Sequence, residues 1–130
     1  MRYVLLSVLS VLCVSTSVVV AGGWPSKSDF DSWAAQRITK YNADSGLVGT
    51  CGKMTEIGSP QTGTIWIFGR WTCGKNYLEA IAETVGVAFR QRFSDGTAVS
   101  IHVWNPLTNE KLATKRMPSR SSGENGVKIR

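Results

Sequence analysis

One segment near the middle of the chain, TIWIFGRWT (residues 64–72), limits the folds that are open to it. Side chains alternate between the two faces of a β-strand. One face of this segment would carry Ile65, Ile67, Gly69 and Trp71, and the other would carry Trp66, Phe68, Arg70 and Thr72. Because both faces are apolar as far as Arg70, the pattern predicts a central strand. One face packs against helices, and the other needs a cover or forms a binding surface.

Two segments with apolar residues at helical spacing flank this strand. The first begins near Ser28, which we expect to cap the helix together with Asp31, and it ends at the turn residues 42–46. Its apolar stripe comprises Phe30, Trp33, Ala34, Ile38 and Tyr41. The second helix begins near Asn76, and Gly86 within it indicates a close contact with the sheet. Its expected buried stripe comprises Leu78, Ile81, Ala82, Val85, Ala88 and Phe89.

Three further segments predict strands. Residues 47–57 form a strand that the turn sequence GSPQTG (residues 58–63) joins to the central strand. Residues 98–104 alternate, with Val99, Ile101 and Val103 on one face. Residues 111–117 predict an edge strand, whose basic side chains discourage further pairing. The order α-β-β-α-β-β predicts an α+β fold: a small single-domain sandwich with two helices on a mainly antiparallel sheet of about four strands.

The N-terminal residues 1–21 have the pattern of a secretory signal peptide. A basic residue precedes an apolar run, and Val19 and Ala21 are small residues suited to cleavage after Ala21. The apolar run is short for a bilayer span of about 20 residues, so we expect a secreted protein without stable membrane insertion. The expected division is a signal peptide at 1–21, the α+β domain at 22–117 and a disordered basic tail at 118–130.

Cleavage after Ala21 would remove Cys13 and leave two cysteines. In an oxidising compartment we expect Cys51 and Cys73 to form a disulfide near the open end of the first hairpin. Two cysteines and a single histidine do not supply the four ligands of a structural zinc site. We therefore expect neither a metal site nor a cofactor.

The residues give little support to catalysis. His102 is the only histidine, which excludes mechanisms that need two. A ribonuclease-like site could use His102, Arg70 and Glu56 around a phosphate, although a solvent-facing strand histidine is the simpler interpretation. The chain has no G-x-S-x-G elbow and no phosphate-binding glycine loop. We expect a protein that is not an enzyme.

The far face of the central strand is the main candidate site. If His102 and Trp104 share it with Trp66 and Phe68, four rings gather beside Arg70. These rings would form either a second small core, covered by the segment around Trp24 or by the C-terminal tail, or an exposed surface for a partner. The candidate binding residues are Trp66, Phe68, Arg70, Trp71, His102 and Trp104.

Positive charge is concentrated near the C-terminus, because acidic and basic residues balance over residues 22–110. The basic segment at residues 111–130 either keeps the protein soluble and protects the sheet edge, or it contacts an anionic partner such as RNA. The residues that would make such a contact are Lys111, Lys115, Arg116 and Arg120.

The chain also resembles a group of small secreted proteins in its general plan. An apolar strand (IWIFGRWT) leads into a helix (NYLEAIAETVGVAF), which returns as a strand (AVSIHVW). Over about residues 46–104 this plan resembles fungal effectors and killer-toxin-like α/β sandwiches, without a family-specific motif. The chain lacks their many cysteines and the aromatic-x-cysteine start of ribonuclease-like effectors, so no site residue carries over. The resemblance implies a secreted agent that binds a foreign macromolecule.

The sequence is compatible with three functions. The first is a secreted, non-enzymatic effector or antagonist that binds a protein of a host or competitor through the aromatic residues. The second is a ribonuclease-like or RNA-binding secreted protein. The third is a secreted enzyme inhibitor that acts through an exposed loop, either residues 58–63 or residues 105–110.

Overall fold

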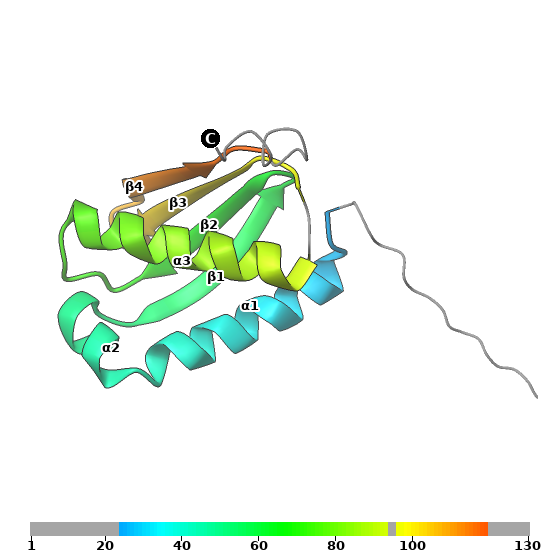
Figure 1. Ribbon diagram of the computed structural model, residues 1–130. Helices are drawn as coiled ribbons and strands as arrows, with labels where there is room; N and C mark the ends of the chain where they lie inside the picture. The colour runs from blue at the N-terminus through cyan, green and yellow to red at the C-terminus, as the bar shows by residue number, and fades with distance from the viewer. Residues whose placement is uncertain (1–23, 94–95, 120–130) are drawn as a thin grey trace, which may run out of the picture.

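In the part of the chain that the structure describes, a four-stranded sheet carries three helices on one of its faces (Figure 1). The computed structural model describes residues 24–93 and 96–119. The helices are α1 (Lys27–Asn42), α2 (Ser45–Cys51) and α3 (Lys75–Phe93), and the strands are β1 (Met54–Gln61), β2 (Thr64–Gly69), β3 (Val99–Asn105) and β4 (Glu110–Met117). The expected α+β fold is confirmed, with one short helix more than the sequence indicated. The expected signal peptide and most of the expected tail lie outside the described residues.

The strand order is β1-β2-β3-β4, so β2 is central, as its two apolar faces predicted. β1 and β2 form an antiparallel hairpin, as do β3 and β4, whereas β2 and β3 pair in parallel. A parallel pair needs a crossover connection, and α3 supplies it by running back across the sheet (Figure 1).

The core lies between the sheet and the helices. Its centre is the row of alternate aliphatic residues on β2 and β3, all fully buried: Ile65, Ile67, Val99, Ile101 and Val103. The predicted stripe of α3 belongs to the same buried cluster and packs on β3 and β4. A Cβ atom built on Gly86 would approach Ile101 Cδ1 to 2.8 Å and would also collide with Met117. The predicted close contact between Gly86 and the sheet is thereby confirmed.

A buried arginine ties three elements together at the end of α3. Arg90 is only 6% exposed, and its guanidinium group donates to the carbonyl oxygens of Thr97, Met117 and Pro118. A buried charge is tolerated only when it is paired or well hydrogen-bonded. These carbonyls provide such bonds and join α3 to the segment before β3 and to the end of β4.

The start of α1 differs from the prediction. Ser26 caps the helix, because its hydroxyl accepts a hydrogen bond from the Asp29 amide at 3.2 Å. Asp31, the expected partner of a Ser28 cap, instead pairs with Lys27 at 2.6 Å. The S-x-x-D pattern occurs twice in the sequence SKSDFD, so spacing alone could not choose between the two serines.

The expected strand at residues 47–57 was wrong in its first half. Residues 45–51 form α2, which Asp44 caps by accepting hydrogen bonds from the amides of Gly46 and Leu47. β1 begins only at Met54 and continues through most of the expected turn to Gln61. The proposed inhibitory loop at residues 58–63 is therefore mostly strand. β2 also ends early, at Gly69, which leaves Trp71 outside the sheet.

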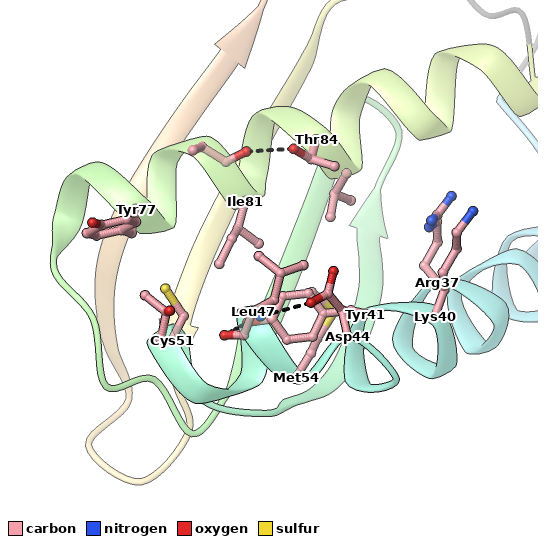
Figure 2. Close-up of a pocket in the computed structure, with 13 residues that line it drawn as sticks. Arg37, Lys40, Tyr41, Asp44, Leu47, Cys51, Met54, Tyr77, Ile81 and Thr84 are labelled. Carbon is pink, nitrogen blue, oxygen red and sulfur yellow. Dashed lines mark hydrogen bonds between the residues drawn. The ribbon is translucent and has the colours of Figure 1, made fainter.

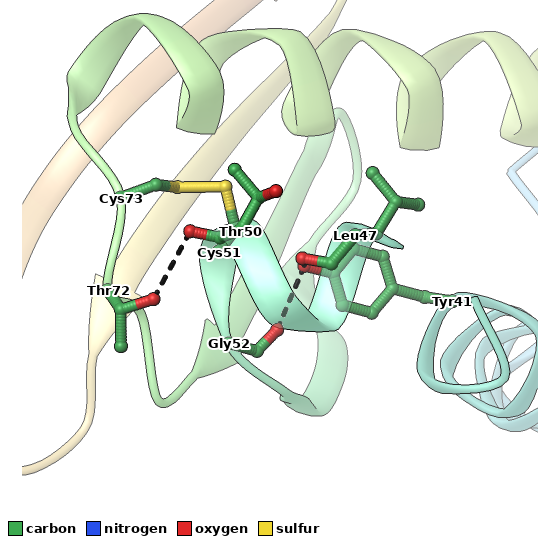
Figure 3. Close-up of a disulfide and its surroundings, with 7 residues drawn as sticks. All are labelled: Tyr41, Leu47, Thr50, Cys51, Gly52, Thr72 and Cys73. Atoms are coloured by element: carbon green, nitrogen blue, oxygen red, sulfur yellow. Dashed lines mark hydrogen bonds between the residues drawn. A yellow bond between two sulfur atoms is a disulfide. The ribbon is translucent and has the colours of Figure 1, made fainter. Parts of the chain in front are cut away.

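The predicted disulfide is confirmed. Cys51 and Cys73 are bonded, with their Cα atoms 4.6 Å apart, just beyond the open end of the β1–β2 hairpin (Figure 3). Nearby hydrogen bonds support it: the Thr72 amide donates to the Cys51 carbonyl at 2.9 Å, and the Tyr41 hydroxyl donates to the Gly52 carbonyl at 2.9 Å. Together these contacts fix α2 between α1 and the segment that leads into α3.

We expect Gly52→Ala to destabilise the protein by about 3 kcal/mol or more. Gly52 has a φ of 91°, and an added Cβ would collide with the backbone carbonyl of Arg70. Gly49→Ala is the matched control, because a Cβ added at that position of α2 would have no neighbouring side chain or loop within 4 Å. That change should stabilise the helix by about 0.5–1 kcal/mol. Urea unfolding would measure both, and an equal stability of the two variants would contradict the expectation.

Candidate functional site

The uncovered face of the sheet carries the aromatic residues singled out in the sequence. Trp66 is the register partner of His102 across the parallel β2–β3 pair, and Phe68 is the partner of Trp104. Partners in register point to the same face, and the other face is the buried aliphatic one. The structure therefore brings these four side chains together, as alternation along the two strands predicts.

Three of the rings form a contiguous cluster. The ring centroid of Trp66 lies 5.3 Å from that of Trp104 and 6.1 Å from that of Phe68. All three side chains are partly buried by one another and by the sheet. In the described part of the chain, α1 and α3 both pack on the opposite face (Figure 1), so no described helix covers this cluster.

The segment around Trp24 does not cover the cluster either. The Trp24 ring packs against Phe89 of α3, with centroids 4.7 Å apart, and so belongs to the helical side of the core. The first of the two covers considered in the sequence is therefore wrong. The second, the C-terminal tail at residues 118–130, lies outside the described residues except for Pro118 and Ser119.

Basic side chains flank the cluster on the strand that borders β3. The ammonium group of Lys111 lies 5.8 Å from the centroid of the Trp104 ring. Arg116 donates a hydrogen bond of 3.3 Å to the hydroxyl of Ser100, which lies on the same face. We call the surface formed by these residues the aromatic sheet surface; its members are Trp66, Phe68, His102, Trp104, Lys111 and Arg116.

Two predicted site residues lie apart from this surface. Arg70 is exposed beyond the end of β2, and it forms no ion pair with any described residue. Trp71 packs against Tyr41, and its indole nitrogen donates to the Trp104 carbonyl at 3.0 Å. Trp71 therefore supports the backbone of Trp104 rather than extending the surface.

The basic residues expected to contact an anionic partner are also divided. Lys111 and Arg116 belong to the aromatic sheet surface, whereas Lys115 reaches the helical side, where its ammonium group lies 3.9 Å from a carboxylate oxygen of Glu83. Arg120 lies outside the described residues.

The possible ribonuclease residues do not form a cluster. Glu56 lies on β1 and His102 on β3, with β2 between them. Neighbouring strands are about 4.8 Å apart, so the two backbones are separated by about 10 Å. His102 contacts Thr114 instead, with Nδ1 3.0 Å from the hydroxyl oxygen. Burial, and secondarily the charge of Lys111, lowers the pKa of His102 below its ordinary value of 6.5.

A second concave site, which the sequence did not reveal, lies on the helical side. A groove of about 430 Å³ runs between α1 and α2 on one side and α3 on the other (Figure 2). We call it the interhelical groove; its lining includes Tyr41, Leu47, Cys51, Met54, Tyr77 and Ile81, with Arg37 and Lys40 at one end. Leu47 and Tyr77 are 41% and 61% exposed. The sequence predicted a strand at Leu47, so it did not indicate α2, the helix that forms part of one wall of the groove.

Other kinds of site find no support among residues 24–93 and 96–119. No three histidine, cysteine or acidic side chains lie close enough there to hold a metal ion. None of the helices in these ranges combines the length and apolarity that a bilayer crossing requires.

We expect the imidazole of His102 to titrate with a midpoint below 6.5. A lowered pKa means that the unfolded chain binds the proton more readily than the folded protein does. The free energy of unfolding should therefore be highest above about pH 6.5 and should decline as the pH falls through that value. Lys111→Gln should raise the midpoint but leave it below 6.5, because burial is the larger cause of the lowered pKa. Lys115→Gln, whose side chain faces Glu83, should leave it unchanged.

The measurement is a proton NMR titration of the His102 ring in the three proteins. A midpoint at or above 6.5 in the unchanged protein would contradict this expectation. It would show that neither burial nor the charge of Lys111 disfavours the protonated imidazole.

Comparison with protein-family models, curated proteins and solved structures finds no match for this chain. The two surfaces described above are therefore the basis for any functional proposal.

Proposed function

We propose that this protein is a secreted, non-enzymatic effector or antagonist that binds a protein of another organism through the aromatic sheet surface. One observation carries the proposal: three aromatic rings are in contact on a sheet face that no described helix covers. Aromatic residues are enriched among those that dominate the energy of protein interfaces.

The layout of the surface also favours a protein partner. Its centre is aromatic, while its borders carry the charges of Lys111 and Arg116 on one side and Glu56 on the other. An apolar centre with a polar rim is the usual anatomy of a protein interface. The rings stand on two paired strands and hold one another in place, so binding would order few side chains.

Two features support secretion. The disulfide between Cys51 and Cys73 fits an oxidising compartment, because cytosolic proteins rarely keep such bonds. The sequence of residues 1–21 has the pattern of a signal peptide.

RNA is the second candidate, because Lys111 and Arg116 lie on the same face as the rings. Single-stranded nucleic acids bind to surfaces that combine basic groups with aromatic rings on which bases stack. However, Trp66 and Phe68 meet edge to face, with an interplanar angle of 83°. One ring face is thus already occupied by its neighbour, which makes the cluster better suited to an apolar protein side chain than to successive bases.

We expect Trp104→Ala to weaken partner binding by about 2 kcal/mol or more, roughly 30-fold, as for central interface aromatics. Folding should be largely kept, because the side chain is only partly buried and its indole nitrogen has no hydrogen-bond acceptor among the described residues. Tyr77→Ala is the matched control, since it removes an exposed aromatic ring from the helical side.

The experiment captures partners from extracts of candidate target organisms with the three proteins and then measures the affinity of the purified partner by calorimetry. A partner retained equally by Trp104→Ala, or a large fall in melting temperature for that variant, would contradict the proposal. For RNA, a single-stranded oligonucleotide titrated at two salt concentrations separates the candidates, because affinity that falls steeply with salt indicates phosphate contacts.

A further inference from the structure

We propose that the interhelical groove binds a fatty acid, with the alkyl chain along the apolar floor and the carboxylate at Arg37 and Lys40. This site lies on the helical layer, on the opposite side of the sheet from the aromatic sheet surface. The inference is therefore independent of the proposed function.

The groove exists because the two long helices rest on different strands. α1 packs on β1, whereas α3 packs on β3 and β4, and the space between them is left open over Met54 and Ile81 (Figure 2). Protein interiors normally fill such spaces. A volume of about 430 Å³ lies within the range of roughly 300–1,000 Å³ that small-molecule sites occupy.

The groove follows α3 over more than one helical turn. Its lining on α3 extends from Tyr77 to Val85, which corresponds to roughly 12 Å along the helix axis. Apolar side chains, among them the partly exposed Leu47, line this length. An alkyl chain laid along α3 would contact these side chains over its length.

Two of the hydroxyl groups that line the groove already donate hydrogen bonds within the protein. The Tyr41 hydroxyl donates to the Gly52 carbonyl at 2.9 Å, and burial, followed by the charge of Asp44, raises the pKa of this tyrosine. The Thr84 hydroxyl donates to the Ala80 carbonyl at 3.0 Å. These two hydroxyl protons are therefore not available to a ligand, which would meet mainly apolar side chains in this part of the groove.

Two cations mark one end of the groove. Arg37 and Lys40 project side by side from α1, at the end away from Tyr77 (Figure 2). Neither forms an ion pair with a carboxylate of the described chain. Asp44, the acidic residue of the lining, is occupied in capping α2. The interhelical groove is thus apolar along its length and has the cations of Arg37 and Lys40 at one end. This arrangement is complementary to a single apolar chain with an anionic head group.

The test is a titration of the oxidised protein with laurate, decanoate and dodecanol below their micelle concentrations, followed by calorimetry and amide NMR. We expect saturable laurate binding, with shifts at Tyr41, Leu47 and Thr84. Decanoate, two methylenes shorter, should bind roughly tenfold more weakly.

Variants separate the two ends of the site. Arg37→Gln combined with Lys40→Gln should weaken laurate about tenfold and leave dodecanol unchanged. Ala80→Trp, at an exposed helical position on the groove, should abolish both by filling the space. Arg116→Gln is the matched control, because it removes a cation from the opposite face.

Several outcomes would overturn the proposal. These are no saturable binding of laurate, equal laurate affinity in the double variant, or shifts confined to the aromatic sheet surface. Groove shifts produced by a peptide of residues 120–130 in place of laurate would assign the groove to the chain's own tail. None of these results bears on the Trp104→Ala experiment, so the two proposals fail separately.

Discussion

The burial of the aliphatic rows of β2 and β3 under the layer of helices determines the rest of the structure. Strand side chains alternate, so burying Ile65, Ile67 and Ile101 on the face that the helices cover forces Trp66 and His102 to the other face. A shift of one residue in register would exchange the two sets and expose the core. Parallel pairing of these strands is equally imposed, because α3 must cross the core to connect them. The aromatic sheet surface is thus a direct consequence of how the core forms.

Much of this arrangement could be predicted from the sequence. The long amphipathic pattern of α3, the strict alternation of β3 and the two apolar faces of β2 each specify one structure, and the structure agrees with all three. The same alternation placed four of the candidate site residues on one face. The disulfide followed from the cysteine count. These features depend on periodicity, which the sequence displays directly.

The parts that could not be predicted depend on tertiary contacts. α2 is a seven-residue helix with two glycines, and such a short helix is not stable by itself. It is held by Tyr41 and by the Cys51 disulfide, neither of which appears in a local pattern. Trp71 lies outside the aromatic sheet surface because β2 ends at Gly69, and its ring packs close to that glycine and to Tyr41. The interhelical groove is lined by residues of three helices and of β1, so the residue pattern of no single segment could indicate it.

The disulfide has a consequence for how the two surfaces would behave in different surroundings. Cys51 is both the last residue of α2 and part of the groove lining, whereas the aromatic sheet surface includes neither cysteine. Breaking the bond would remove one of the ties that hold this wall of the groove, another being the hydrogen bond from Tyr41 to the Gly52 carbonyl. Reduction would therefore act directly on the groove, and it would reach the aromatic sheet surface only through Trp71, which lies two residues before Cys73 and donates to the Trp104 carbonyl.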